Sequence, residues 1–160
     1  AKTVHYNNQK RVLRALELYY QTGTTMSQQL INSKPPQSPY DAVVIGLAAK
    51  NRAFLYERIN SRVEQMIKNG VLQEAEYVYQ NKDSFVTAAQ AIGYKEFFPY
   101  LEGKESLAVC TEQLKQASRK YAKRQLTWFN RVPNLHWVYI DDDELSPLQQ
   151  VESIWEKESK

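Results

Sequence analysis

Residues 121–131 read Tyr-Ala-Lys-Arg-Gln-Leu-Thr-Trp-Phe-Asn-Arg, and the helix expected to contain them organises the fold of the chain. From Gln113 to Ile140 the sequence has no Asp or Glu, and its six cations are Lys115, Arg119, Lys120, Lys123, Arg124 and Arg131. At about 100° per residue, these cations fall on one half of a helix. The opposite side carries an apolar arc made of Leu107, Cys110, Leu114, Ala117, Tyr121 and Trp128. The pattern predicts one face in a protein core and the other toward a polyanion. Trp128, Phe129 and Gln125 favour RNA over a solvated basic face.

Composition indicates a globular chain with unevenly distributed charge. The 160 residues are 42% hydrophobic and 24% charged, with a net charge of +3. Residues 141–160 form an acidic tail with seven acids, so residues 1–140 hold 19 Lys and Arg against 11 Asp and Glu. A basic body with grouped cations favours an anionic partner.

Several classes of protein are disfavoured. The single cysteine, Cys110, excludes an internal disulfide and lies on the apolar arc, where a buried, inert thiol is expected. His5 and His136 have no ligand partners at zinc spacing, so we expect no metal site. The sequence shows no signal peptide and no apolar run of the roughly 18 residues that a membrane span requires. We therefore expect a cytoplasmic protein without a membrane partner.

Hydrophobic spacing and punctuating residues predict a mainly α chain with two short strands. Asn7 or Asn8 is expected to cap the first helix and Gly23 to end it. A linker with three prolines is expected at 32–39, and a continuous apolar run predicts a buried strand at 42–47. The second strand is expected at 135–140. Helices are expected at residues 9–21, 24–31, 51–68 and 71–82. A short helix is expected toward Leu101, a long one from residue 106 that ends before Pro133, and a weak one at 151–156.

Arg62 stands out because it projects beside the apolar stripe of the helix at 51–68, formed by Leu55, Ile59, Val63 and Met66. In one interpretation Arg62 extends its charged end to solvent or pairs with an acid inside the protein. In the other, it is directed into a cleft, where its planar guanidinium binds phosphate through two parallel hydrogen bonds. None of the five glycines begins a phosphate loop or a dinucleotide fingerprint. Residue patterns alone therefore lead only to a mostly helical domain that faces RNA.

Four sequence blocks together resemble the tRNA dimethylallyltransferases, also called tRNA isopentenyltransferases. They are residues 8–17 with Thr22 and Gly23, residues 62–66, residues 91–96 and residues 121–129. The resemblance covers the C-terminal half of that family. It implies a parent of the α/β P-loop type, similar to nucleotide kinases, that binds nucleotide. Residues 1–40 would belong to its helical insertion, which contacts tRNA, and residues 41–160 to the C-terminal half of its catalytic core.

The resemblance also implies an activity. Family members use Mg²⁺ to transfer a dimethylallyl group from dimethylallyl diphosphate to N6 of the adenosine 3′ of the tRNA anticodon. Arg62 matches the arginine that contacts the diphosphate, and the Mg²⁺ ligands and phosphate loop are expected upstream. The residues that match contacts with the anticodon stem-loop are Lys10, Arg11, Arg14, Gln90, Gly93, Tyr94, Lys95, Lys123, Arg124, Gln125, Thr127, Trp128 and Asn130.

Two departures and two alternatives accompany the resemblance. Residues 5–8 read His-Tyr-Asn-Asn where the family often has His-Pro-Asn-Asp, and Asn130 stands where arginine is common. This chain alone is expected to be inactive, and the parent to be monomeric. A non-catalytic RNA-binding module is one alternative and predicts an internally paired Arg62. An adenylate isopentenyltransferase is the other, which the basic stretch at 123–131 disfavours because a mononucleotide needs no such surface.

Overall fold

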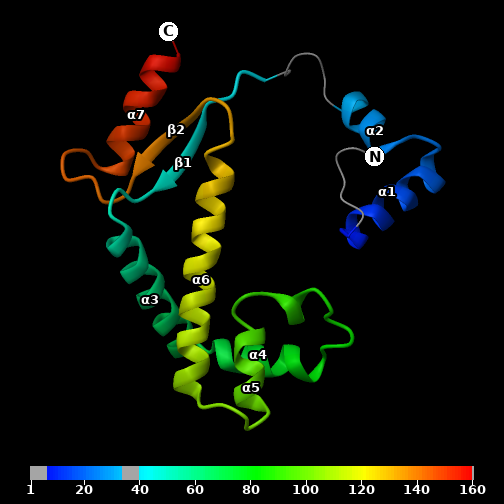
Figure 1. Cartoon of the computed structure of the whole chain (residues 1–160). Coiled ribbons are helices and arrows are strands. Elements are labelled where there is room, and N and C mark those ends of the chain that lie inside the picture. The colour runs from blue at the N-terminus through cyan, green and yellow to red at the C-terminus, as the bar shows by residue number, and fades with distance from the viewer. Residues whose placement is uncertain (1–6, 34–39, 160) are drawn as a thin grey trace. The chain divides into compact units, whose positions relative to one another are not determined.

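A computed structural model of the chain describes residues 7–33 and 40–159, and it contains two compact units, Ala1–Ala42 and Val43–Lys160 (Figure 1). The first unit contains α1 (Gln9–Thr22) and α2 (Met26–Asn32). The Asn8 side chain caps α1 by accepting from the Arg11 amide at 3.3 Å, and Gly23 ends it at φ 68°, as expected. The linker expected at 32–39 falls mostly on residues 34–39, which lie outside the described residues.

The second unit combines a two-stranded sheet with helices. Strand β1 (Val44–Ala48) pairs in parallel with β2 (Leu135–Tyr139), from Val44 opposite Leu135 to Ala48 opposite Tyr139. The prediction of a mainly α chain with two short strands is confirmed. The helices, including two 3-10 turns named η, are α3 (Arg52–Lys68), α4 (Val71–Gln80), η1 (Ala88–Gln90), η2 (Lys95–Phe97), α5 (Phe98–Leu101), α6 (Leu107–Phe129) and α7 (Pro147–Glu158).

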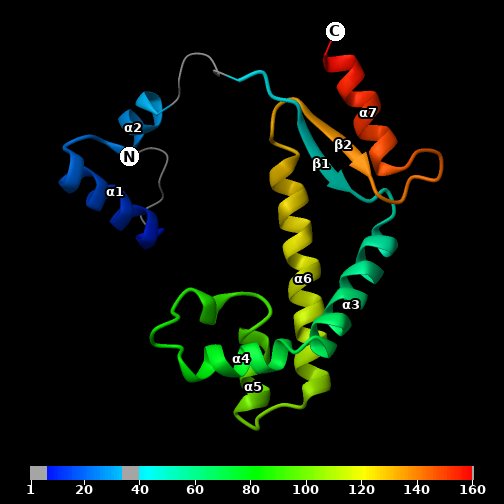
Figure 2. The same ribbon diagram turned by 180° about the vertical axis from the view of Figure 1, so that it is seen from behind.

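The long helix α6 connects the two ends of this unit. Its N-cap, Ser106, accepts a hydrogen bond from the Val109 amide at 3.3 Å. Its 23 residues span about 35 Å at 1.5 Å per residue. Figures 1 and 2 show α3 and α6 close together near α4 and farther apart near the sheet. The buried residues of α6, Cys110 and Leu114, both lie in its first half.

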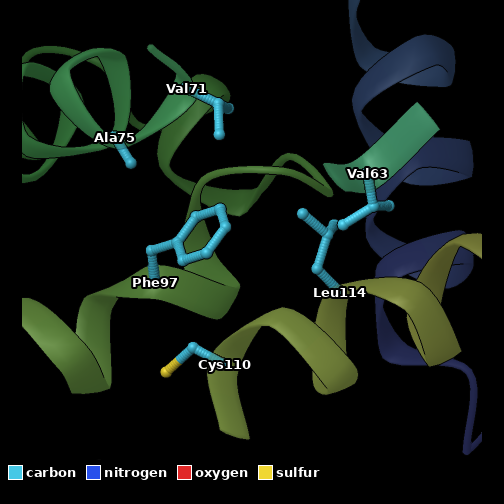
Figure 3. Packing of buried hydrophobic residues seen from close by; sticks show 6 residues of the cluster. All are labelled: Val63, Val71, Ala75, Phe97, Cys110 and Leu114. Atoms are coloured by element: carbon cyan, nitrogen blue, oxygen red, sulfur yellow. The ribbon is translucent and has the colours of Figure 1, made fainter. Parts of the chain in front are cut away.

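The hydrophobic core lies at that packed end of α6. Phe97 of η2 is fully buried, and Val63 of α3 and Leu114 of α6 are 2% and 1% exposed. Figure 3 shows Val63 and Leu114 beside each other, with Cys110, Val71 and Ala75 completing the cluster. Burial raises the pKa of the Cys110 thiol, in agreement with the expected inert cysteine.

The sheet differs from the expectation of a buried first strand. Only Gly46 of β1 is buried, whereas the side chain of Leu47 is 64% exposed. Helix α7 packs beside β2 (Figures 1 and 2), so β1 receives little cover within this unit. The apolar run predicted a strand correctly but not its burial, which depends on the elements that surround it.

Helix α7 is longer than the weak helix expected at 151–156. Ser146 accepts from the Gln149 amide at 3.3 Å, and the Gln149 side chain accepts from the Ser146 amide at 2.9 Å. This reciprocal capping box, with Pro147 at the first helical position, begins the helix four residues before Val151. The Gln150 amide group further ties α7 to β2 through both backbone groups of Tyr139, each at 2.8 Å.

Two residues of the acidic tail have a structural role where β1 leads into α3. The Asp141 carboxylate accepts from the amides of Lys50 and Asn51, both at 2.7 Å. The neighbouring Asp142 forms an ion pair with the Lys50 side chain and accepts from the amides of Glu144 and Leu145. These interactions, above all the hydrogen bond from Lys50, lower the pKa of Asp142 to about 2.

Because the pKa of Asp142 is lowered in the folded chain, the stability of the fold should depend on pH. The unfolded chain protonates Asp142 near its ordinary pKa of 3.8, whereas the folded chain keeps it ionised down to about pH 2. The stability from this group is therefore present above about pH 4 and is lost as pH falls toward 2. We expect Asp142→Asn to lower the thermal midpoint at pH 5 and to flatten its fall between pH 4 and 2. Asp143→Asn, at an exposed neighbour without an ion pair among the described residues, is the control. Identical pH curves for Asp142→Asn and the wild type would contradict this role.

Candidate nucleic-acid interface

A cavity of about 600 Å³ separates α3 from α6 within the second unit. Its lining is apolar except for a few side chains and comprises Ile59, Arg62, Val63, Met66, Ile92, Leu114, Ser118, Tyr121, Ala122 and Gln125. Arg62 is the one charged residue among them. The structure therefore brings two of the residues singled out from the sequence, Arg62 and Gln125, to one cavity.

Helix α3 places Arg62 at the cavity without burying it. Val63, the next residue, is buried against α6, so Arg62 is rotated about 100° away from the core and remains exposed. Its guanidinium makes no ion pair or hydrogen bond within the part of the chain that the structure describes. An unpaired arginine at an apolar cavity retains its five N–H donors for an anion. The internal pairing expected of a non-catalytic module is not found among these residues.

The turn at residues 91–96 forms another part of the cavity wall. Gly93 adopts φ 112°, which favours glycine, and its amide donates to the buried Glu96 carboxylate at 2.9 Å. This hydrogen bond holds Ile92 at the cavity and leaves Gln90 and Lys95 exposed. Glu96 belongs to the motif seen in the sequence, but its role in holding the turn could not be inferred without the fold.

Tyr94 is partly buried, and its ring packs against the core cluster. Its hydroxyl donates to Glu74 at 3.1 Å, and this hydrogen bond, together with burial, raises the pKa of Tyr94. The Tyr94 hydroxyl is therefore engaged within the protein, while the turn that carries it lies next to the cavity.

The basic face of α6 divides into two halves. In the first half, Lys115 donates to Glu64 of α3 at 2.9 Å, and Arg119 contacts Glu112 at 2.8 Å and Asn60 at 2.7 Å. The hydrogen bond from Lys115 lowers the pKa of Glu64. These two cations are occupied within the protein, contrary to the expectation that all six face a polyanion.

The second half of α6 keeps its charge available. Lys120, Lys123 and Arg131 make no ion pair with any described residue, and Arg124 lies over the Tyr121 ring with its guanidinium carbon 5.4 Å from the ring centre. A hollow of about 320 Å³ on this surface is lined by Lys123, Arg124, Thr127, Trp128 and Arg131. The cations of α6 that have no ion pair with a described residue therefore lie in the C-terminal half of the helix.

The apolar arc also ends sooner than the helical pattern predicted. Cys110 and Leu114 are buried, but Tyr121 is 47% and Trp128 63% exposed. The reason is geometric, because the elements of the core contact only the first half of α6 (Figures 1 and 2). The Trp128 and Phe129 rings meet edge to face, with centres 5.5 Å apart, beside the unpaired cations. Aromatic surface next to cations is the combination that binds unpaired bases and their phosphates.

The remaining residues expected to contact tRNA lie elsewhere. Lys10, Arg11 and Arg14 are exposed on α1, in the first unit, which is described by itself. Arg14 pairs with Glu17 at 3.4 Å, the surface ion pair that their spacing allows. Asn130 is the C-cap of α6 and lines a separate pocket with Lys123 and Thr127.

The described residues do not fit a magnesium site or a membrane span. They contain no group of three His, Cys, Asp or Glu side chains arranged to hold a metal ion. Asp141 and Asp142 are adjacent, but backbone amides and Lys50 occupy their carboxylates. No helix in the same residues is long and apolar enough to cross a bilayer.

Comparison with known proteins gives a consistent family. The family model described as IPP transferase matches residues 1–132. The tRNA dimethylallyltransferase of Enterococcus faecalis is 44% identical over 100% of this chain and 51% of its own length. The tRNA dimethylallyltransferase of Lactobacillus gasseri is 46% identical over 98% of this chain and 51% of its own length. The chain thus spans about half the length of the curated relatives it matches, as the resemblance to one half of the family predicts.

Solved structures agree with the sequence comparison. The tRNA delta(2)-isopentenylpyrophosphate transferase of Staphylococcus epidermidis aligns with a TM-score of 0.65 at 37% identity, covering 98% of this chain and 50% of that one. A eukaryotic dimethylallyltransferase acting on tRNA aligns with a TM-score of 0.72 at 28% identity, covering 98% and 40%. These neighbours have the P-loop-type fold that was expected of the parent. The chain belongs to the IPP transferase family.

Proposed function

We propose that this chain is part of an enzyme that transfers a dimethylallyl group from dimethylallyl diphosphate to N6 of the adenosine 3′ of a tRNA anticodon. The chain supplies contacts to the tRNA and to the diphosphate. The single observation that carries the proposal is the unpaired Arg62 at an otherwise uncharged cavity, next to the free cations of α6. Relatives named for transfer to tRNA favour this substrate over a free adenylate.

The chemistry assigns Arg62 to the leaving group. The N6 amine attacks the allylic carbon, the carbon–oxygen bond to the diphosphate breaks, and N6 loses a proton. Negative charge therefore grows on the departing diphosphate, and a guanidinium placed there stabilises the transition state more than the ground state. The base that receives the proton is assigned to no residue of this chain, which would therefore be inactive alone.

The RNA contacts divide according to chemistry. Lys123 and Arg124, with Lys95 and the cations of α1, would bind phosphates, whereas the exposed Trp128 offers aromatic surface for stacking. Tyr94 packs against the core, so its part in tRNA binding would be to hold the turn that carries Gly93 and Lys95. Gln125 reaches the same cavity as Arg62, where a flipped adenosine must arrive to react. The other proposed contacts, suited to hydrogen bonding or to close backbone approach, are Gln90, Gly93, Thr127 and Asn130.

Two broader assignments complete the proposal. Residues 1–40 would belong to the helical insertion that grips tRNA, and residues 41–160 to the catalytic core of a cytoplasmic enzyme. Magnesium, which the resemblance implies, would neutralise the diphosphate when bound, but we assign it no ligand among the described residues because they offer no suitable cluster.

Replacing two free cations of α6 tests the RNA surface. We expect Lys123→Ala with Arg124→Ala to weaken binding of an anticodon stem-loop to this chain. The slope of log affinity against log salt should fall by about 1.4 if both side chains contact phosphates of a single strand. Fluorescence anisotropy of the labelled stem-loop at several salt concentrations measures both quantities.

The matched control is Lys115→Ala with Arg119→Ala, which removes the same charges from the internally paired half of the same helix. Circular dichroism checks that both double variants remain folded. Equal affinity for the wild type and Lys123→Ala with Arg124→Ala would refute the assignment of this surface.

Replacing Arg62 separates catalysis from folding. In the whole protein, Arg62→Ala should lower the rate of prenyl transfer more than the affinity for tRNA, because the side chain is assigned to the leaving group. Arg62→Lys, which keeps the charge but not the planar fork, should recover part of the rate. Single-turnover transfer from labelled dimethylallyl diphosphate measures the rate. Insoluble protein for both variants would instead support a structural role.

A further inference from the structure

A second cationic pocket lies between α3 and α6, closer to the sheet than the cavity that holds Arg62. It measures about 270 Å³ and is formed by the loop after β1, the first turns of α3 and the last turns of α6. Its lining comprises Ala49, Lys50, Arg52, Leu55, Tyr56, Lys123, Leu126, Thr127 and Asn130, which include three cations and no carboxylate. The crevice at the carboxyl end of parallel strands is also where ligands bind in α/β sheets.

Arg52 is the unassigned residue in this pocket. Its Nε and one terminal nitrogen both donate to the Tyr56 hydroxyl, at 2.7 and 2.5 Å, and its guanidinium carbon lies 5.0 Å from the Tyr56 ring centre. Tyr56 is four residues later on α3, so the helix itself sets this geometry. A neutral phenol orients the guanidinium without cancelling its charge, and Arg52 has no ion pair among the described residues.

The other two cations around the pocket, Lys50 and Lys123, differ in whether an acid neutralises them. Lys50 is held by Asp142, so its charge is largely compensated within the protein. Lys123 approaches from α6 and has no acidic partner among the described residues. Arg52 and Lys123 therefore face one small pocket from two helices, each with its charge uncompensated. This arrangement suits a phosphate group, which accepts hydrogen bonds from both a guanidinium fork and an ammonium.

Position along α3 favours one source for that phosphate. Arg52 and Arg62 are ten residues apart, which is about 15 Å along the axis of a helix. Each arginine lines its own pocket, and neither lining includes the other arginine. Since Arg62 is assigned to the diphosphate under the proposed function, on which this step rests, we assign the phosphate at Arg52 to a different molecule.

We propose that Arg52, oriented by Tyr56 and joined by Lys123, binds a phosphodiester of the tRNA strand. The tRNA would then contact the start of α3 as well as the C-terminal half of α6, so that the strand is held on both sides of the space between these helices. Neither the helical pattern nor the four motifs pointed to Arg52, because its significance depends on Lys123, which is 71 residues away.

The test compares Arg52→Ala with the wild type in the whole 160-residue chain, using an anticodon stem-loop and salt titrations. We expect weaker binding and a slope of log affinity against log salt that falls by about 0.7, the value for one lost phosphate contact on a single strand. Arg52→Lys should retain the slope but lose part of the affinity. The matched control is Arg58→Ala, an exposed arginine of α3 that stacks on Phe54 and lines neither pocket, which should leave both quantities unchanged.

A second arm uses inorganic diphosphate as the probe, measured by calorimetry. Weaker diphosphate binding by Arg52→Ala with unchanged RNA binding would overturn the tRNA source and assign the pocket to the diphosphate. If Lys123→Ala with Arg124→Ala weakens RNA binding but Arg52→Ala changes neither ligand, this inference alone fails. If neither variant weakens RNA binding, the proposed function of the surface fails with it.

Discussion

The packing of the first half of α6 against α3 and η2 is the constraint on which the rest of this unit depends. Val63, Phe97 and Leu114 are almost completely buried where these elements meet, and burial of such side chains contributes about 1.5–3 kcal/mol each. The continuous hydrogen bonding of α6 then carries its second half away from the core. Charged and aromatic side chains can remain exposed there because their helix is anchored elsewhere.

That anchoring explains how the cations of one helix acquire two roles. Near the core, α3 approaches closely enough for Glu64 and Asn60 to engage Lys115 and Arg119. Farther along, the helices diverge (Figures 1 and 2), and Lys120, Lys123 and Arg131 make no ion pair with a described residue. The space between the helices holds one pocket with Arg62 and another with Arg52 and Lys123, so positive charge comes from both α3 and α6. Such an arrangement concentrates positive electrostatic potential in the space that a polyanion would enter.

Local signals predicted more of this molecule than its tertiary contacts. The cap at Asn8 and the stop at Gly23 are predictable because their chemistry acts within four residues, and the strands are predictable as apolar runs. The capping box of Ser146 and Gln149 is an equally local signal, and it places the start of the last helix at Pro147. The exposure of Leu47 and Trp128, the Lys115 partner Glu64 and the meeting of Arg52 with Lys123 were not predictable. Each depends on segments that are distant in sequence, which a periodic pattern cannot place.

The most direct measurement of the central claim is a map of backbone amide chemical shifts during titration with an anticodon stem-loop. The account predicts saturable changes concentrated in residues 118–129 of α6 and the two residues after it, the start of α3 and the turn at 90–95. Residues 107–117, in the packed half of α6, should change little because their one cation, Lys115, is paired with Glu64. Changes confined to residues 107–117 or to α7, or the absence of saturable binding, would contradict an RNA-binding site between α3 and the C-terminal half of α6.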